Sequence, residues 1–195
     1  MLVNEDKTKV LDINFSASPL QRVSDLETVG CLNILGLIFN SNLNWSDHFA
    51  HVSSNVSKRL YILRVLKPIL DHDQLILVFN SIIRSIIDYA SPVFLNPGIV
   101  QSSKLEMLCK RAFRIIHGAN VNTCDNCSMF HVCQRRKELS MRLFNQALND
   151  SNHILHRLLP PLSQRSKRLI LPHVKTMRRL NGFVLSCSMC YNNST

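Results

Sequence analysis

Cationic side chains at helical spacing give the clearest chemical signal in this chain. Lys110, Arg111 and Arg114 lie in a segment whose apolar residues predict a helix. Residues three and four apart share one side of a helix, so these cations can reach successive phosphates along a duplex. The alternative is a solvated helix face. The candidate nucleic-acid contacts are Lys104, Lys110, Arg111, Arg114, Arg135, Arg136, Lys137, Lys175, Arg178 and Arg179.

Two Cys-x-x-Cys pairs are the candidates for a metal site. The four residues are Cys124, Cys127, Cys187 and Cys190. Tetrahedral Zn²⁺ takes four nitrogen or sulfur ligands, so the two pairs together could form a Cys₄ site. His131 and Cys133 could instead complete the first pair, but a single residue separates them, which is poor spacing for two ligands. This mismatch favours unliganded thiols.

Motifs for hydrolysis and phosphoryl transfer are absent from the sequence. It contains no Gly-x-Ser-x-Gly elbow, no Gly-rich phosphate loop and no His-Glu-x-x-His motif. It also contains no Asp-Asp pair, whereas two-metal phosphoryl transfer requires metal-binding carboxylates. We therefore expect no catalysis by this chain alone, and no cofactor of its own apart from the zinc alternative.

The net charge of +10 is unevenly distributed. Residues 1–103 contain eight Lys or Arg and nine acidic residues, whereas residues 104–195 contain fifteen Lys or Arg and four acidic residues. No acidic side chain follows Asp150. Such an excess attracts polyanions, above all nucleic acid. A solubilising surface or an unfolded basic tail is the alternative.

Composition predicts a folded intracellular protein, cytoplasmic or nuclear, with no membrane partner. The 195 residues, 46% of them hydrophobic, can bury one substantial core. No run reaches the roughly 18 apolar residues that a membrane span requires. The first residues include Glu5 and Asp6 and lack the pattern of a secretory signal, and an odd number of cysteines argues against a disulfide framework.

The N-terminal part predicts a small antiparallel sheet. Residues 10–15 alternate between apolar and polar, and a second strand is expected around residues 21–26. Residues 32–39 are nearly all apolar, which suits a strand covered on both faces. Gly36 within that strand indicates a bulge or a close backbone approach. Trp45 is expected to fill the junction between the sheet and the following helix.

Four helices are expected over residues 46–66, 71–88, 100–117 and 132–149. Asp71 and Gln74 form a capping-box pattern, and Gly118 is placed to end the third helix. In the fourth helix we expect Leu139, Leu143 and Ala147 to be buried and the cations to be exposed. Beyond Pro160-Pro161 the apolar residues show little periodicity.

The predicted fold is mainly α (α+β), with a small N-terminal antiparallel sheet, a helical bundle and a basic, partly irregular tail. Its predicted parts are strands over residues 1–45, a helical bundle over 46–120, a Cys-containing loop and basic helix over 121–150, and a basic tail over 151–195.

Short motifs follow one another along residues 4–185. In chain order they are Asn4-x-x-Lys7-Thr8-Lys9, Leu35-Gly36 through Trp45-x-x-His48, Ser57-Lys58-Arg59-Leu60, Asp88-Tyr89-Ala90-Ser91-Pro92-Val93, Lys110-Arg111-Ala112-x-Arg114-Ile115-Ile116, Leu143-Phe144-Asn145-x-Ala147-Leu148-Asn149-Asp150, His153-x-x-His156 and Lys175-Thr176-x-Arg178-Arg179. This order resembles the end of the palm, the thumb and the tail of non-LTR (LINE/jockey-like) retrotransposon reverse transcriptases. Asn40 stands where that family usually has Asp.

The resemblance implies a part of an RNA-directed DNA polymerase without its catalytic palm. Family enzymes bind two Mg²⁺ through a Tyr-x-Asp-Asp turn and a further Asp, which would lie upstream of residue 1. The family's thumb packs against the template–primer hybrid. The implied partners are therefore RNA or an RNA–DNA hybrid and the remainder of the reverse transcriptase.

Two other interpretations remain open at the level of sequence. The chain could be a non-enzymatic helical interaction protein whose basic half binds an acidic partner. Residues 45–66 also weakly resemble the short N-terminal segment of AlkB-type tRNA-modifying dioxygenases. The His-x-Asp…His iron site of those enzymes is absent, so this second resemblance implies no activity.

Overall fold

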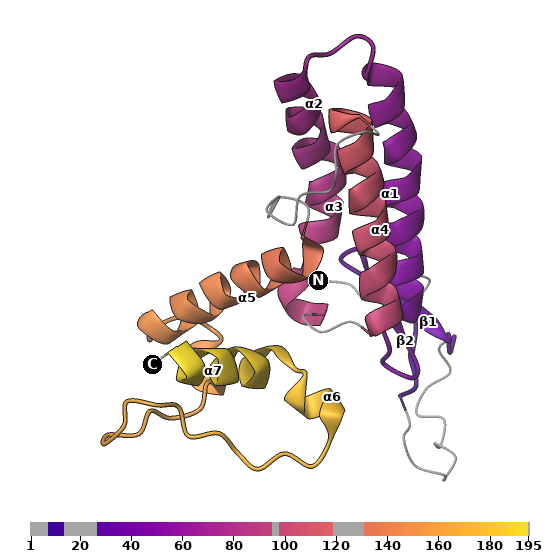
Figure 1. Cartoon of the computed structure of the whole chain (residues 1–195). Coiled ribbons are helices and arrows are strands. Elements are labelled where there is room, and N and C mark those ends of the chain that lie inside the picture. Colours follow the sequence, from indigo (N-terminus) through magenta and orange to yellow (C-terminus); the bar gives the residue numbers. More distant parts are fainter. Residues whose placement is uncertain (1–7, 14–26, 95–97, 119–130, 195) are drawn as a thin grey trace. The chain divides into compact units, whose positions relative to one another are not determined.

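The computed structural model describes residues 8–13, 27–94, 98–118 and 131–194. It is mainly helical with one small antiparallel sheet, which confirms the predicted fold class (Figure 1). The chain divides into two compact units, residues 1–55 and 56–195, and each is described by itself. Among the described residues, no helix has both the length and the apolar character needed to cross a membrane.

The sheet of the first unit is a two-stranded hairpin. Strand β1 (Cys31–Ile34) pairs antiparallel with β2 (Leu37–Asn40). Leu35 and Gly36 form the turn, and both have positive φ, 51° and 80°, as a tight two-residue hairpin requires. The prediction of one continuous strand over residues 32–39 is therefore wrong. A run of apolar residues has no alternation that could reveal a turn inside it.

The other predicted strands are only partly described. Within residues 10–15, Val10 forms a parallel bridge with Thr28 and accepts a hydrogen bond from the Val29 amide at 2.8 Å. The strand expected around residues 21–26 lies outside the described residues.

Asn40 connects the hairpin to the start of α1 (Ser46–Leu66), which has the predicted bounds. The Asn40 amide donates to Asp47 Oδ2 at 2.7 Å and to Asn44 Oδ1 at 2.8 Å. Asn44 Oδ1 also accepts from the Ser46 amide at 3.2 Å, so Asn44 caps the first turn. Trp45 is half-buried, with its ring centroid 5.3 Å from that of Phe39.

In the second unit, α2 (His72–Val78) begins with the predicted capping box. The Gln74 amide donates to Asp71 Oδ1 at 2.8 Å, and the Asp71 amide donates to Gln74 Oε1 at 3.1 Å. The chain continues without a break through a π-helix, η2 (Phe79–Arg84), into α3 (Ser85–Asp88).

The π-helix corrects the expectation of a uniform α-helix over residues 71–88. The buried residues recur every fourth position, at Leu75, Phe79, Ile83 and Ile87. A regular α-helix of 3.6 residues per turn would rotate such a series away from one face. The wider π turn offsets that rotation and keeps all four side chains inside.

Two longer helices follow the short 3-10 helix η3 (Ser91–Phe94). Helix α4 (Ile99–His117) ends at Gly118, whose φ of 95° confirms the predicted cap. Helix α5 (Val132–Asn149) has the predicted bounds, and α4 packs against both α2 and α5.

The inward face of α5 differs from the prediction. The buried residues are Val132, Arg136, Ser140, Phe144 and Ala147. Ala147 was predicted to be buried, but Leu139 and Leu143 are only half-buried. The charge of Arg136 predicted an exposed position, whereas the side chain is buried with its guanidinium over the Phe94 ring.

The last part of the chain is more ordered than its sequence pattern indicated. It contains η5 (His156–Leu158), α6 (Met177–Leu180) and α7 (Phe183–Ser194). Phe144 of α5, Leu169 and Cys187 of α7 form a small buried core. Residues 159–176 are irregular as expected, but the α7 helix was not predicted.

Candidate nucleic-acid interface

Helix α4 has an apolar face and, on its opposite side, a cationic face. Its buried residues are Leu105, Leu108, Cys109, Ala112, Phe113 and Ile116. Its opposite side carries four exposed cations, here called the basic stripe: Lys104, Lys110, Arg111 and Arg114. The stripe extends for about 15 Å at 1.5 Å per residue. The predicted contacts on this helix therefore lie together on its exposed face.

Within the described part of the chain, no acidic side chain pairs with the basic stripe. Among the described residues, none of its four side chains forms an ion pair. Glu106 is the one acidic residue of α4, and its side chain bonds to the start of α5. Glu106 Oε1 accepts the backbone amides of Val132 and Cys133 at 2.9 and 3.3 Å.

These two bonds cap α5 from another helix. His131, the residue before α5, provides no side-chain cap. The first amides of a helix have no intrahelical acceptor, and a carboxylate there also interacts favourably with the helix dipole. Glu106 therefore connects α4 to α5, and its carboxylate does not offset the charge of the stripe.

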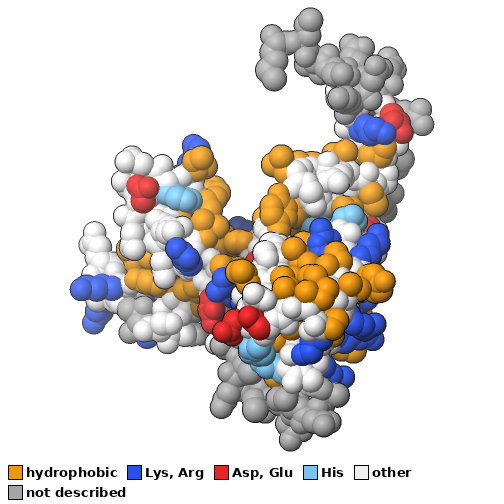
Figure 2. All heavy atoms as spheres, turned by 90° about the horizontal axis from the view of Figure 1, so that it is seen from above, with side chains coloured by type: hydrophobic (Ala, Val, Ile, Leu, Met, Phe, Trp, Pro, Cys, Tyr) orange, Lys and Arg blue, Asp and Glu red, His pale blue; other side chains and the backbone are white. Residues whose placement is uncertain are grey.

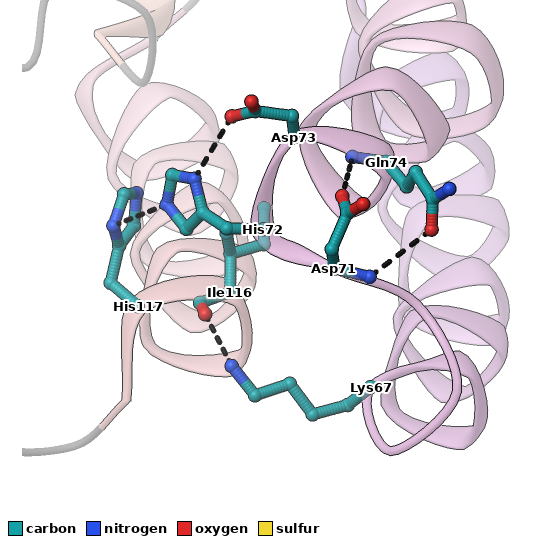
Figure 3. Close-up of polar contacts among 7 residues, drawn as sticks. All are labelled: Lys67, Asp71, His72, Asp73, Gln74, Ile116 and His117. Atoms are coloured by element: carbon teal, nitrogen blue, oxygen red, sulfur yellow. Dashed lines mark hydrogen bonds and ion pairs between the residues drawn. The ribbon is translucent and has the colours of Figure 1, made fainter.

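Two histidines meet at the C-terminal end of α4 (Figure 3). His72 Nε2 lies 3.0 Å from His117 Nδ1, and the two rings meet edge to face with centroids 4.6 Å apart. His72 Nδ1 lies 3.3 Å from Asp73 Oδ1. Burial, with the nearby charges of His72 and Lys67, lowers the pKa of His117 below its ordinary value of 6.5. The pair therefore favours a neutral His117.

Lys67 fixes the same end of α4. Its Nζ donates to the backbone carbonyl of Ile116 (Figure 3). The last carbonyls of a helix lack intrahelical donors, and a cation is favourable at that end. The turn between α1 and α2 thus holds α4, and with it the basic stripe.

Helix α5 presents its three predicted contacts in three different ways. Arg135 Nε lies 3.3 Å from Asp88 Oδ2, so its charge is largely used within the protein. Arg136 is 1% exposed, and its guanidinium lies 5.1 Å from the centre of the Phe94 ring. Burial lowers the pKa of Arg136 to about 10. Lys137 is exposed.

The expectation that Arg136 faces solvent is therefore wrong. A buried guanidinium cannot reach a phosphate, and this one is held in the interior by packing. Sequence spacing alone does not distinguish it from Lys137, because adjacent residues differ only in which side of the helix they occupy.

The C-terminal cations lie on irregular backbone and on α6. Lys175 and Arg179 are exposed, and the side chain of Arg178 is outside the described part. Three further exposed cations, Arg165, Lys167 and Arg168, were missed as candidate contacts. The sequence did contain a signal for these three cations, because no acidic residue follows Asp150.

The predicted Cys₄ site is only half described, since Cys124 and Cys127 lie outside the described residues. Cys187 is buried in the apolar core, and burial raises its pKa to about 12. Cys190 is exposed. Zinc binds the thiolate form, which burial of Cys187 disfavours. Within the described ranges, no group of three or more His, Cys, Asp or Glu is placed to hold a metal ion.

The surface also carries hydrophobic side chains beside the cationic ones (Figure 2). On the outer side of α1 and the following turn, Tyr61, Val65 and Ile69 are 68%, 49% and 72% exposed. On α4, Met107 is 56% exposed within the basic stripe. The accessible face of the stripe therefore combines cationic and apolar character.

Comparison with models of known protein families, with curated proteins and with solved structures gave no match to this chain.

Proposed function

We propose that this chain grips the sugar-phosphate backbone of RNA or an RNA–DNA hybrid through the basic stripe of α4. In this proposal it acts as the thumb-like part of an RNA-directed DNA polymerase of the non-LTR retrotransposon type. Mg²⁺ would belong to the catalytic palm of the complete enzyme.

One observation carries the proposal. Four exposed cations share one face of a single helix, and the acidic residue of that helix is directed to the neighbouring α5. A cationic face that forms no ion pair with the described residues gains most when its binding releases the counterions condensed on a polyanion. Ion pairs between these cations and acidic side chains of the protein itself would have reduced this gain in binding free energy.

The structure also supports the rigidity that such a grip needs. Helix α4 is held at its C-terminal end by Lys67 and His72, and through Glu106 it is tied to α5. Because the cations are fixed to one rod, little further order has to be created on binding. Such contacts give affinity without sequence preference.

Salt dependence of binding tests the proposal. Fluorescence anisotropy with a labelled RNA–DNA hybrid should show affinity falling as salt rises. The Arg111→Gln/Arg114→Gln variant should reduce the slope of log K against log salt by roughly 2, about 0.9 for each lost phosphate contact. The matched control is Lys58→Gln/Arg64→Gln, which removes two exposed cations of α1 and should leave the slope unchanged.

Two results would count against this function. One is an unchanged slope in the α4 variant, which would remove the stripe from the contact. The other is competition by an acidic polypeptide as strong as that by a hybrid of equal charge, which would favour an acidic protein partner instead.

A further inference from the structure

The segment after α5 contains an anchored hairpin that the proposed function does not use. Leu162 and Leu169 form an antiparallel bridge. The Ile170 amide donates to the Pro161 carbonyl at 2.9 Å, and the Ser163 amide donates to the Arg168 carbonyl at 2.8 Å. Residues 161–170 therefore form a short hairpin, and its tip is residues 163–168, which lie between the bridged pair.

Helix α7 holds one arm of this hairpin in place. The Leu169 amide donates to Asn192 Oδ1 at 2.8 Å, and Asn192 Nδ2 donates to the Leu169 carbonyl at 2.9 Å. The Leu169 side chain is 3% exposed and packs with Phe144 and Cys187. The side-chain amide of Asn192 thus pairs with both backbone polar groups of Leu169, as a neighbouring strand would.

The tip of the hairpin is cationic. Arg165, Lys167 and Arg168 are all exposed, and none forms an ion pair with another described residue. The tight turn gives Lys167 a positive φ of 54°. No acidic residue follows Asp150 in the sequence, so this lobe has no nearby acidic side chain of its own segment.

An apolar groove opens at the base of the same hairpin. It has a volume of about 630 Å³, and both hairpin arms contribute to it. Its lining includes Leu158, Pro161, Ile170, Pro172, Arg179 and Phe183. Leu158 and Ile170 are 61% and 55% exposed, so much of this apolar surface faces solvent.

We propose that this hairpin and groove bind single-stranded nucleic acid, separately from the basic stripe. Unstacked bases would lie in the apolar groove, and the backbone phosphates would contact Arg179 and the cations of the hairpin tip. This juxtaposition of apolar groove and cations matches a ligand with apolar faces and a regularly charged backbone. A duplex offers the phosphates but keeps its base faces stacked.

The inference rests on the proposed function for the class of partner, but it uses different residues, so the two can fail separately. The test uses the full chain and two labelled probes, a single-stranded oligonucleotide and an RNA–DNA hybrid. Arg165→Gln/Lys167→Gln/Arg168→Gln is compared with Lys104→Gln/Arg111→Gln/Arg114→Gln. Each variant removes three positive charges.

The hairpin variant should lower the salt slope for the single strand by about 2, at roughly 0.7 per contact, and leave hybrid binding nearly unchanged. The variant of the basic stripe should instead lower the salt slope for the hybrid and leave single-strand binding nearly unchanged. Leu158→Gln/Ile170→Gln should weaken single-strand binding about five- to tenfold without changing its salt slope, since it removes apolar contact and no charge. Both substituted residues are mostly exposed, so the fold is retained.

Several outcomes overturn the inference. A hairpin variant with the wild-type slope on the single strand shows that the tip makes no phosphate contact. A groove variant with wild-type affinity shows that bases do not enter the groove. Equal competition by polyglutamate of matched charge assigns the surface to an acidic polypeptide. Loss of hybrid binding only in the variant of the stripe supports both proposals, whereas absence of hybrid binding in the wild type refutes the first alone.

Discussion

Replacing Glu106 tests how α4 and α5 are joined. The Glu106 carboxylate accepts the first two amides of α5, at 2.9 and 3.3 Å, and no side chain of α5 itself replaces this cap. Loss of a capping side chain costs about 0.5–2 kcal/mol. Loss of a negative charge at a helix N-terminus costs about 0.3–1 kcal/mol.

Glu106→Ala should therefore lower the free energy of unfolding by about 1–3 kcal/mol. Glu106→Gln retains an acceptor oxygen and loses only the charge, so its cost should be about 0.3–1 kcal/mol. Urea unfolding monitored by far-UV circular dichroism measures both values. Hydrogen exchange adds a local readout, because the amides of Val132 and Cys133 should exchange about tenfold faster in Glu106→Ala.

Glu138→Ala is the matched control. Glu138 is an exposed glutamate on α5, and its ion pair with Arg135 has a distance of 4.0 Å. An exposed pair of this kind contributes little, so stability should change by less than about 0.5 kcal/mol. Equal stability of Glu106→Ala and Glu138→Ala, or unchanged exchange of the two amides, would refute the reasoning that α4 caps α5.

Three further perturbations have defined outcomes. Phe144→Ala, at a fully buried position in contact with α7, should cost about 3–5 kcal/mol in urea unfolding and reduce helical circular dichroism. Arg136→Ala should cost about 2–4 kcal/mol through lost packing, whereas the exposed neighbour Lys137→Ala should stay within about 0.5 kcal/mol; equal effects would contradict the burial of Arg136. The lowered pKa of His117 means that the unfolded state binds the proton more tightly, so stability should fall as pH decreases below 6.5. His117→Gln should lessen that fall, and an identical pH profile would contradict the assignment.

Local patterns in the sequence were sufficient for the main helices. The bounds of α1 and α5 agree with the prediction, and the capping box at Asp71 and the terminal Gly118 are present. These signals work because helix periodicity and cap chemistry involve residues only a few positions apart. The same reasoning placed the basic stripe on one face, since residues three and four apart share a side of any helix.

Where a prediction failed, the deciding interaction was between residues distant in sequence or a turn within an apolar run. The hairpin at Leu35-Gly36 interrupts a largely apolar run, in which Gly36 alone was taken as a bulge and not as a turn. Arg136 and Lys137 are adjacent cations, and Arg136 is the one that is buried, against Phe94.

The sequence by itself determined that this protein is mainly helical, that its positive charge lies in the second half, and that α4 has a cationic side. Tertiary structure alone decided which cations are accessible, because accessibility depends on what packs against each face. It also brought Glu106 to the start of α5 and Asn192 to Leu169, across separations of 26 and 23 residues. No local spacing rule specifies such pairs, since the chain between them is free to take many paths until the core is formed.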